Sequence, residues 1–230
     1  MATSTVAIVD VRPDLTAAHR EAWQALGQPG TWWSGAQRLE LAATARTAMT
    51  EPSPLAPWTA PSTIDGWLAD DLAAPPRAHD AIYRVARHAG TLTESWYEGV
   101  CSELTDLAYV ELVGIACTVA AVVAFRHAAG LAPSELPLPV GGEPSRATPS
   151  NLVPAALNWV RVTSPADERA AVVQAFTSVP AEHQRLWNLA DAQYIPDLEM
   201  VDPHWTRGTL SRPQMELVAA RVSRLRECFY

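Results

Sequence analysis

The sequence predicts an all-α protein made of two related helical halves joined by a proline-rich linker. Apolar residues recur at helical spacing along most of the chain, and no train of alternating, strand-like segments interrupts them. Hydrophobic residues make up 48% of the 230 positions, which is enough for a sizeable buried core. Between residues 131 and 165 the helical period is lost and prolines become frequent, which indicates a linker or an extended wrapping segment.

Capping residues and helix breakers delimit the expected helices. Asp14 is a natural N-cap and Gly27 a natural C-cap of the first helix. Thr91 or Thr93 caps the fifth helix, and Ser211 caps the last. In chain order, the expected helices cover residues 14–27, 35–49, 62–74, 77–90, 91–104, 105–130, 165–179, 180–194 and the stretch after 211.

These helices divide the chain into three segments. Residues 1–130 form an N-terminal helical repeat, residues 131–165 the proline-rich linker and residues 166–230 a C-terminal helical repeat. "YVELVGIAC" (109–117) and "QMELVAARV" (214–222) both place Glu-Leu-Val before a helix of small residues. This match indicates duplication of a helical unit.

The charge of the chain limits the classes of partner. The formal net charge is −8, and every basic residue is an arginine. Because phosphate binding needs clustered positive charge, we expect neither a nucleic-acid partner nor an anionic membrane. The most apolar run, residues 112–125, is about 14 residues long, whereas a bilayer-spanning helix needs about 20. We therefore expect this run to form a buried core helix.

The N-terminus and the cysteines favour a cytoplasmic protein with free thiols. The first residues have neither the basic stretch nor the apolar run of a signal peptide. Three cysteines cannot all pair within one chain, which fits a reducing compartment. Cys117 is expected to be an inert core residue and Cys101 a structural one. Cys228 differs from both because of its spacing from Glu216.

The last helix carries the candidate catalytic residues. Its apolar residues repeat at spacings of three, four and three and predict one buried stripe: Met215, Val218, Val222 and Leu225. Glu216 is flanked by this stripe, and burial would raise its pKa and suit it to proton transfer. The alternative is a glutamate near the helix start that complements the helix dipole.

Cys228 lies twelve residues after Glu216, which is about 18 Å of rise on one straight helix. Direct contact between the two side chains therefore requires the chain to turn just before the cysteine. A second helix beginning near "CFY" would supply that turn. It would also place the sulfur at a helix N-terminus, where the dipole lowers the pKa of a thiol.

Glu216 and Cys228, separated by the eleven residues "LVAARVSRLRE", resemble the first part of a known motif. It is the Glu-x11-Cys-x2-Cys-x3-His motif of the alkylhydroperoxidase D and carboxymuconolactone decarboxylase family. The likeness extends through residues 19–43, 92–99, 109–114, 152–160 and 179–195, and it looks like a two-repeat branch of the family. The resemblance implies an alkylhydroperoxidase D-like helical fold and a homo-oligomer.

By this resemblance Glu216 belongs to a proton relay, and Cys228 is the resolving partner of a dithiol. The attacking cysteine and the histidine of the motif would fall at positions 231 and 235. The printed sequence is therefore expected to be a piece that ends inside the motif. In the first repeat, the same offsets from Glu111 give Val123, Arg126 and Gly130, so that half is expected to lack redox activity.

The resemblance implies a peroxiredoxin-type oxidoreductase, a thiol-dependent hydroperoxide reductase with antioxidant activity. Its substrate would be a hydroperoxide or another small molecule, and its reductant an external dithiol. No cofactor and no metal are implied. Two alternatives stay open: a non-catalytic helical oligomer that binds a ligand, and a decarboxylase-like enzyme with acid–base chemistry at Glu111 or Glu216. A peroxidase needs its cysteine, whereas such a decarboxylase needs only its glutamate.

Other noticeable residues are expected to be structural. The Trp32–Trp33 pair is expected in the core rather than around a pocket. The Asp70–Asp71 pair has no companion at metal-ligand spacing. His79 and His88 are expected on the surface of one helix, and His127 is expected to cap the end of the long apolar helix.

Overall fold

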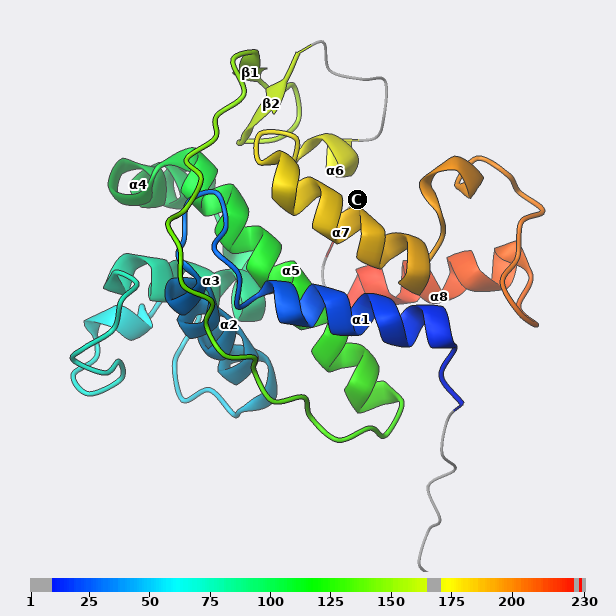
Figure 1. The fold of residues 1–230 in the computed structure, drawn as a ribbon, viewed down its shortest axis with the longest axis horizontal. Helices are drawn as coiled ribbons and strands as arrows, with labels where there is room; N and C mark the ends of the chain where they lie inside the picture. Colours follow the sequence, from blue (N-terminus) through cyan, green and yellow to red (C-terminus); the bar gives the residue numbers. More distant parts are fainter. Residues whose placement is uncertain (1–9, 165–170, 226–227, 229–230) are drawn as a thin grey trace, which may run out of the picture.

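The computed structural model describes residues 10–164, 171–225 and 228, and this part of the chain is built mainly from α-helices (Figure 1). The all-α class is thereby confirmed. The helices are α1 (Pro13–Ala25), α2 (Gly35–Thr50), α3 (Pro76–His88), α4 (Glu94–Leu104), α5 (Asp106–Ala128), α6 (Ala171–Gln174), α7 (Pro180–Gln193) and α8 (Arg212–Leu225). Short 3-10 turns cover Pro61–Thr63, Ala89–Thr91 and Asp197–Glu199, and β1 (Leu152–Pro154) pairs antiparallel with β2 (Arg161–Thr163).

Helix α5 forms the centre of the fold, as the apolar run predicts. Twelve of its residues are buried, and α1, α2, α3, α4 and α7 all contact it. Thr105 caps it, because its side chain accepts a hydrogen bond from the backbone N–H of Ala108 at 3.2 Å. By length and hydropathy α5 could also cross a membrane, a property it shares with the core helices of soluble proteins.

The ends of the first helices show which local signals matter. Ser34 forms a capping box with Gln37: each side chain bonds the backbone N–H of the other residue. Helix α1 begins at Pro13, so Asp14 lies inside the helix and is not its N-cap. The helix expected over 62–74 is wrong. A 3-10 turn and irregular turns replace it, and Gly66 has a φ of +72°, which a continuous α-helix does not allow.

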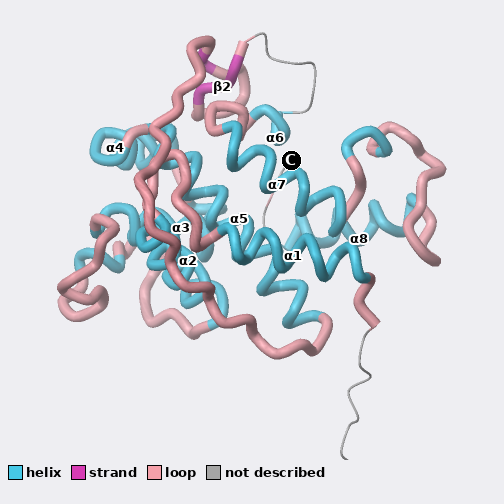
Figure 2. The backbone as a smooth tube through the Cα atoms, viewed as in Figure 1, coloured by secondary structure: helices cyan, strands magenta, loops and turns pink. Residues whose placement is uncertain are grey.

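The proline-rich segment wraps the molecule, which was one of its two predicted roles. Figure 2 shows it as a long loop running from the end of α5 to β1. Its backbone bonds the turn between α1 and α2: Val140 N–H donates to Gly27 O at 2.8 Å and Arg146 N–H to Thr31 O at 2.9 Å. The Arg146 guanidinium also lies over the Trp32 ring, 5.2 Å from its centroid.

Helix α7 joins the C-terminal part of the chain to the N-terminal core. It packs against α1 and α5, and Figure 1 shows α1 and α7 side by side. The expected helix over 165–179 is represented by α6, Ala171–Gln174; its residues 165–170 lie outside the described part. The boundary between two repeats stays a prediction.

The predicted buried stripe on the last helix is wrong. Helix α8 has no buried residue, and three of the four stripe residues are more than half exposed: Val218 (58%), Val222 (53%) and Leu225 (64%). The spacing of these residues correctly indicates an amphipathic helix, but spacing does not show what covers its apolar face. In the described chain this face is largely open to solvent.

His79 is a core residue, which corrects the expectation of a surface position. Its ring is 1% exposed, and Nδ1 lies 2.8 Å from the Thr44 hydroxyl. Burial lowers the pKa of His79, and the nearby Glu40 carboxylate opposes that shift only in part. The folded protein therefore keeps this ring neutral at pH values at which a histidine in an unfolded chain begins to bind a proton.

This burial predicts a loss of stability in mild acid. Below about pH 6.5 the unfolded chain binds more protons than the folded one, so the free energy of unfolding falls as the pH is lowered. One such histidine contributes at most about 1.4 kcal/mol per pH unit. Urea unfolding between pH 7.5 and 5.5 measures the slope, which His79→Gln should reduce. His204→Gln, at an exposed histidine, should leave it unchanged, and equal slopes in all three proteins would contradict the prediction.

Candidate functional site

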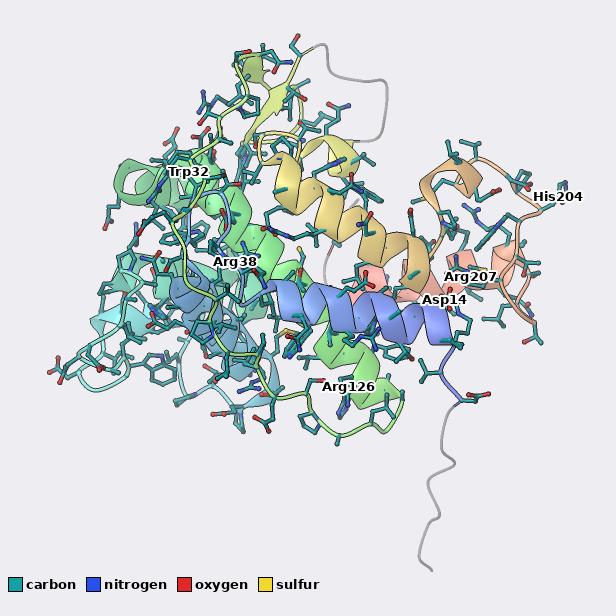
Figure 3. All side chains as sticks on the ribbon, viewed as in Figure 1. Asp14, Trp32, Arg38, Arg126, His204 and Arg207 are labelled. Atoms are coloured by element: carbon teal, nitrogen blue, oxygen red, sulfur yellow. The ribbon has the colours of Figure 1, made fainter. Side chains whose placement is uncertain are left out.

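Three charged side chains from distant parts of the sequence meet in the core. They are Arg38 of α2, Glu111 of α5 and Glu182 of α7, and none is more than 1% exposed. Arg38, labelled in Figure 3, donates through Nη1 to Glu111 Oε1 and, at 2.7 Å, to Glu182 Oε1. We refer to these three residues as the buried ion cluster.

Further hydrogen bonds complete the buried ion cluster. Glu111 Oε2 accepts the backbone N–H of Thr31 at 2.9 Å and that of Trp32 at 2.6 Å. Glu182 Oε1 also accepts a hydrogen bond from Arg185, which is partly exposed. Two carboxylates thus face two guanidinium groups, and such a balance is needed to hold ionised groups away from water.

Two glycines make room for the carboxylates of the cluster. A Cβ on Gly30 would overlap the Glu111 carboxylate and lie 2.7 Å from Arg38 Nη1. A Cβ on Gly114 would lie 2.9 Å from Glu182 Oε2. The residues at positions 30 and 114 therefore have to be small for the cluster to keep this geometry.

Burial raises the pKa of Glu111, while Arg38 and the backbone N–H of Trp32 oppose that rise. A raised pKa fits the acid–base role considered for this residue. However, its side chain is fully buried, and both of its oxygens are occupied by partners within the protein. The cluster therefore ties α2, α5 and α7 together, and Glu111 does not meet solvent in this arrangement.

An apolar cavity of about 300 Å³ lies next to the cluster, between α5, α6 and α7. We call it the α5–α7 cavity. It is lined by Cys117, Ala121, Val172, Phe176, Leu186, Trp187, Leu189, Ala190, Gln193 and Tyr194. Cys117 follows Gly114 by one helical turn on α5, so the cavity opens along the same helix that carries Glu111.

Cys117 is not the core residue that its position in the apolar run predicts. Its side chain is exposed, because it borders the α5–α7 cavity and a second hollow of about 500 Å³ between α3, α5 and α8. Burial, followed by the charge of Glu182, raises the pKa of this thiol to about 11. The sulfur can be reached, but it is held as a neutral thiol.

The predicted site residue Glu216 contacts Tyr194, which lines the same cavity. Its Oε1 accepts a hydrogen bond from the Tyr194 hydroxyl at 3.2 Å and one from Arg212 Nε at 2.6 Å. The Glu216 side chain is 48% exposed, so the expected desolvation is not found. Burial, and then Glu216, raises the pKa of Tyr194, which therefore keeps its proton at neutral pH.

The structure does not bring Glu216 and Cys228 together. Helix α8 continues from Glu216 to Leu225, about 13 Å of rise, and Cys228 follows as an exposed free thiol. The backbone N–H of Cys228 donates to Ser223 O at 2.9 Å. The proton-relay and thiol roles of these two residues stay predictions.

Sequence reasoning missed Arg38, Glu182 and Tyr194. A signal for Arg38 was present, because it shares the otherwise apolar face of its helix with Leu41, Ala42 and Ala45. For Glu182 and Tyr194 no comparable signal exists, since their roles depend on partners from distant helices.

Comparisons with protein-family models, with curated proteins and with solved structures give no match to this chain. The class of the protein is therefore defined by its own features: a helical protein with a buried ion cluster and an adjoining apolar cavity. Among the described residues, no group of three histidine, cysteine, aspartate or glutamate side chains is arranged to hold a metal ion.

Proposed function

We propose that this chain binds a small, uncharged and largely apolar molecule in the α5–α7 cavity. The observation that carries the proposal is the lining, since none of the ten described residues that form it bears a charge at neutral pH. A charged ligand would lose its hydration there without gaining a partner. The volume of about 300 Å³ lies at the lower end of the range for small-molecule sites.

The rim of the cavity would orient such a ligand. Tyr194 keeps its proton, and its hydroxyl already has an acceptor in Glu216. A carbonyl or hydroxyl oxygen on the ligand could compete for that proton. This chemistry favours a molecule with an apolar body and one polar group at its outer end. It would also place Glu216, a predicted site residue, beside a bound molecule.

A neutral fluorescent probe, N-phenyl-1-naphthylamine, tests the proposal. Ala121→Phe places a large side chain in the lining, and we expect it to weaken probe binding by at least about tenfold, or 1.4 kcal/mol. Ala128→Phe, at an exposed position on the same helix and outside the lining, is the matched control and should bind as the wild type does. Fluorescence titration gives the affinities, and circular dichroism verifies that both variants fold. Equal binding by the two variants, or no binding by the wild type, would reject the proposal.

Thiol-dependent hydroperoxide reduction, implied by the family resemblance, is the second candidate function. One observation favours it: Cys117 and Cys228 are both exposed free thiols, so a hydroperoxide could reach either. In this reaction the sulfur attacks a peroxide oxygen, a sulfenic acid forms and an alcohol leaves, after which an external dithiol restores the thiol. The raised pKa of Cys117 argues against that residue as the attacking group, because the thiolate is the nucleophile.

Substitution of the two exposed cysteines distinguishes the two candidate functions. Peroxide consumption with dithiothreitol is measured for the wild type, Cys117→Ser and Cys228→Ser. Turnover that is lost in one of the variants supports the peroxidase and identifies its sulfur. Absence of turnover in the wild type rejects it for this chain, and probe binding in the α5–α7 cavity does not depend on that outcome.

A further inference from the structure

A second pair of cavities lies at the other end of α5, beneath the start of the proline-rich segment. Their volumes are about 510 and 360 Å³, and they share five lining residues, Trp23, Val122, Arg126, Leu131 and Ser134. Figure 3 shows Arg126 near the end of α5, before the chain enters this segment. We call the two cavities together the basic hollow.

The walls of the basic hollow are unusually positive for this protein. Three arginines line it: Arg20, Arg46 and Arg126. Glu135 is the single carboxylate residue in the two linings, and its side chain belongs to an exposed residue. The whole chain, by contrast, has 25 acidic and 17 basic residues.

These three arginines have no carboxylate partner within the described residues. Arg126 Nε donates to Ala132 O at 2.6 Å, and Arg46 Nη1 reaches Ser134 O at 3.3 Å. Arg20 makes no hydrogen bond or ion pair with any described residue. Other arginines of the protein do pair with carboxylates: Arg12, Arg38, Arg77, Arg84, Arg161, Arg185 and Arg212. The basic hollow thus keeps guanidinium N–H groups available for an anion.

Most of the remaining lining residues are apolar, and contacts hold two of the aromatic side chains in place. Trp23 is 4% exposed, and its Nε1–H donates to Glu135 O at 2.7 Å, which fixes the indole against the segment above it. The rings of His19 and Phe125 meet edge to face, with their centroids 4.8 Å apart. Burial lowers the pKa of His19, and its contact with Gln193 Oε1 at 2.8 Å opposes that shift only in part, so the ring contributes a neutral wall.

We propose that the basic hollow binds a small organic anion, namely a carboxylate attached to an aromatic or other apolar body. The carboxylate would accept hydrogen bonds from Arg126 and Arg20, which line the larger of the two cavities, because guanidinium groups bind carboxylates through two parallel N–H bonds. The apolar body would pack against Trp23 and Phe125. This site is distinct from the α5–α7 cavity, whose lining is uncharged.

The test uses 1-naphthoate as the probe, with two companions that each lack one part of the ligand chemistry. Calorimetric titration should show binding of 1-naphthoate to the wild type. Neutral 1-naphthamide and inorganic phosphate should each bind at least about tenfold more weakly. Equal affinity for naphthoate and naphthamide would overturn the proposal, and so would phosphate binding as tightly as naphthoate.

Three substitutions in the lining test whether naphthoate binds in the basic hollow. Arg126→Gln should weaken naphthoate binding by about tenfold or more. Arg20→Gln should weaken it without a cost in stability, because Arg20 is exposed and has no partner among the described residues. Glu135→Gln removes the one like charge from the wall and should strengthen binding. Arg221→Gln, on exposed α8 and outside both linings, is the control. Unchanged affinity in all three lining variants would overturn the proposal.

Separate readouts keep this proposal apart from the proposed function. Ala121→Phe should leave naphthoate binding unchanged, and Arg20→Gln should leave binding of the neutral probe unchanged. High salt should weaken naphthoate binding and spare the neutral probe, because only the former depends on exposed charge. Naphthoate binding that is lost in Ala121→Phe but kept in Arg20→Gln would place the anion in the other cavity and overturn the proposal.

Discussion

Arg38→Met should lower the free energy of unfolding by about 3–5 kcal/mol, the range found when one partner of a buried ion pair is removed. The substitution leaves the carboxylates of Glu111 and Glu182 in the core with Arg185 as the remaining cation. Two backbone N–H groups still reach Glu111, but they carry no net charge. A methionine fills most of the volume of the arginine stem, so the loss reports the charge rather than a cavity.

Urea unfolding of the wild type and Arg38→Met at neutral pH measures this loss. Arg221→Met is the matched control, since Arg221 is exposed and has no ion pair with any described residue, and it should change stability by less than about 0.5 kcal/mol. The deficit of Arg38→Met should shrink as the pH falls, because protonated carboxylates no longer need a cation. Arg38→Lys, which keeps the charge, should fall between the wild type and Arg38→Met. A deficit below about 1 kcal/mol would show that the cluster does not hold charged groups.

Gly30→Ala is the second large effect that we expect, at about 3 kcal/mol, the upper end of the range for overpacking. The new Cβ would overlap the Glu111 carboxylate and crowd Arg38 Nη1. Both neighbours are side-chain ends, which are often able to move, but here each is held by several hydrogen bonds in the core. The methyl group therefore has to displace the cluster or the turn that carries Thr31.

Gly141→Ala is the matched control for this substitution. A Cβ at position 141 meets no heavy atom within 4 Å, so thermal and urea unfolding should show little change or a slight gain in stability. Shortening the carboxylate provides a further test. In a Glu111→Asp background, Gly30→Ala should cost less than it does in the wild type, because the overlap is relieved. Equal costs in both backgrounds would mean that the methyl group does not act through Glu111.

The sequence predicted those parts of the fold that depend on local pattern. The apolar period predicted the extents of α2 and α5. In the structure Ser34 and Thr105 cap these two helices, and the role of Ser34 was recognised only there. The proline-rich segment was predicted as a linker or a wrapping segment, and contacts with the turn at Gly27 decide between these roles. Local pattern does not include such contacts, since they join residues that are distant in sequence.

Burial was harder to predict than secondary structure. The burial of the stripe on α8 was inferred from periodicity, and that of Cys117 from its position in an apolar run. In the structure the stripe is largely exposed and Cys117 borders two cavities, so neither inference identified what covers the residue. The predicted homo-oligomer would supply such a cover for α8, and it stays a prediction. His79 shows the reverse case: a polar residue is buried, and Thr44 on α2 bonds one of its two ring nitrogens, Nδ1.

In the candidate site, too, the local sequence pointed to single residues but not to their distant partners. Glu111 and Glu216 were recognised as candidate residues from the sequence, but the partners that define their chemistry were not. Arg38 lies 73 positions before Glu111, and Tyr194 lies 22 positions before Glu216. The cavity beside them is a property of packing between α5 and α7, which no single segment encodes.

The buried ion cluster also constrains the order of events during protein synthesis. Glu182 follows Arg38 by 144 positions, which corresponds to about 7–29 seconds at about 5–20 residues per second. Glu111 is made 73 positions after Arg38, and from then on these two residues can meet, while the faces of α1 and α5 that α7 covers remain exposed. The nascent chain therefore presents an uncovered apolar surface until α7 has left the ribosome. Completion of the core depends on a long-range contact that forms late.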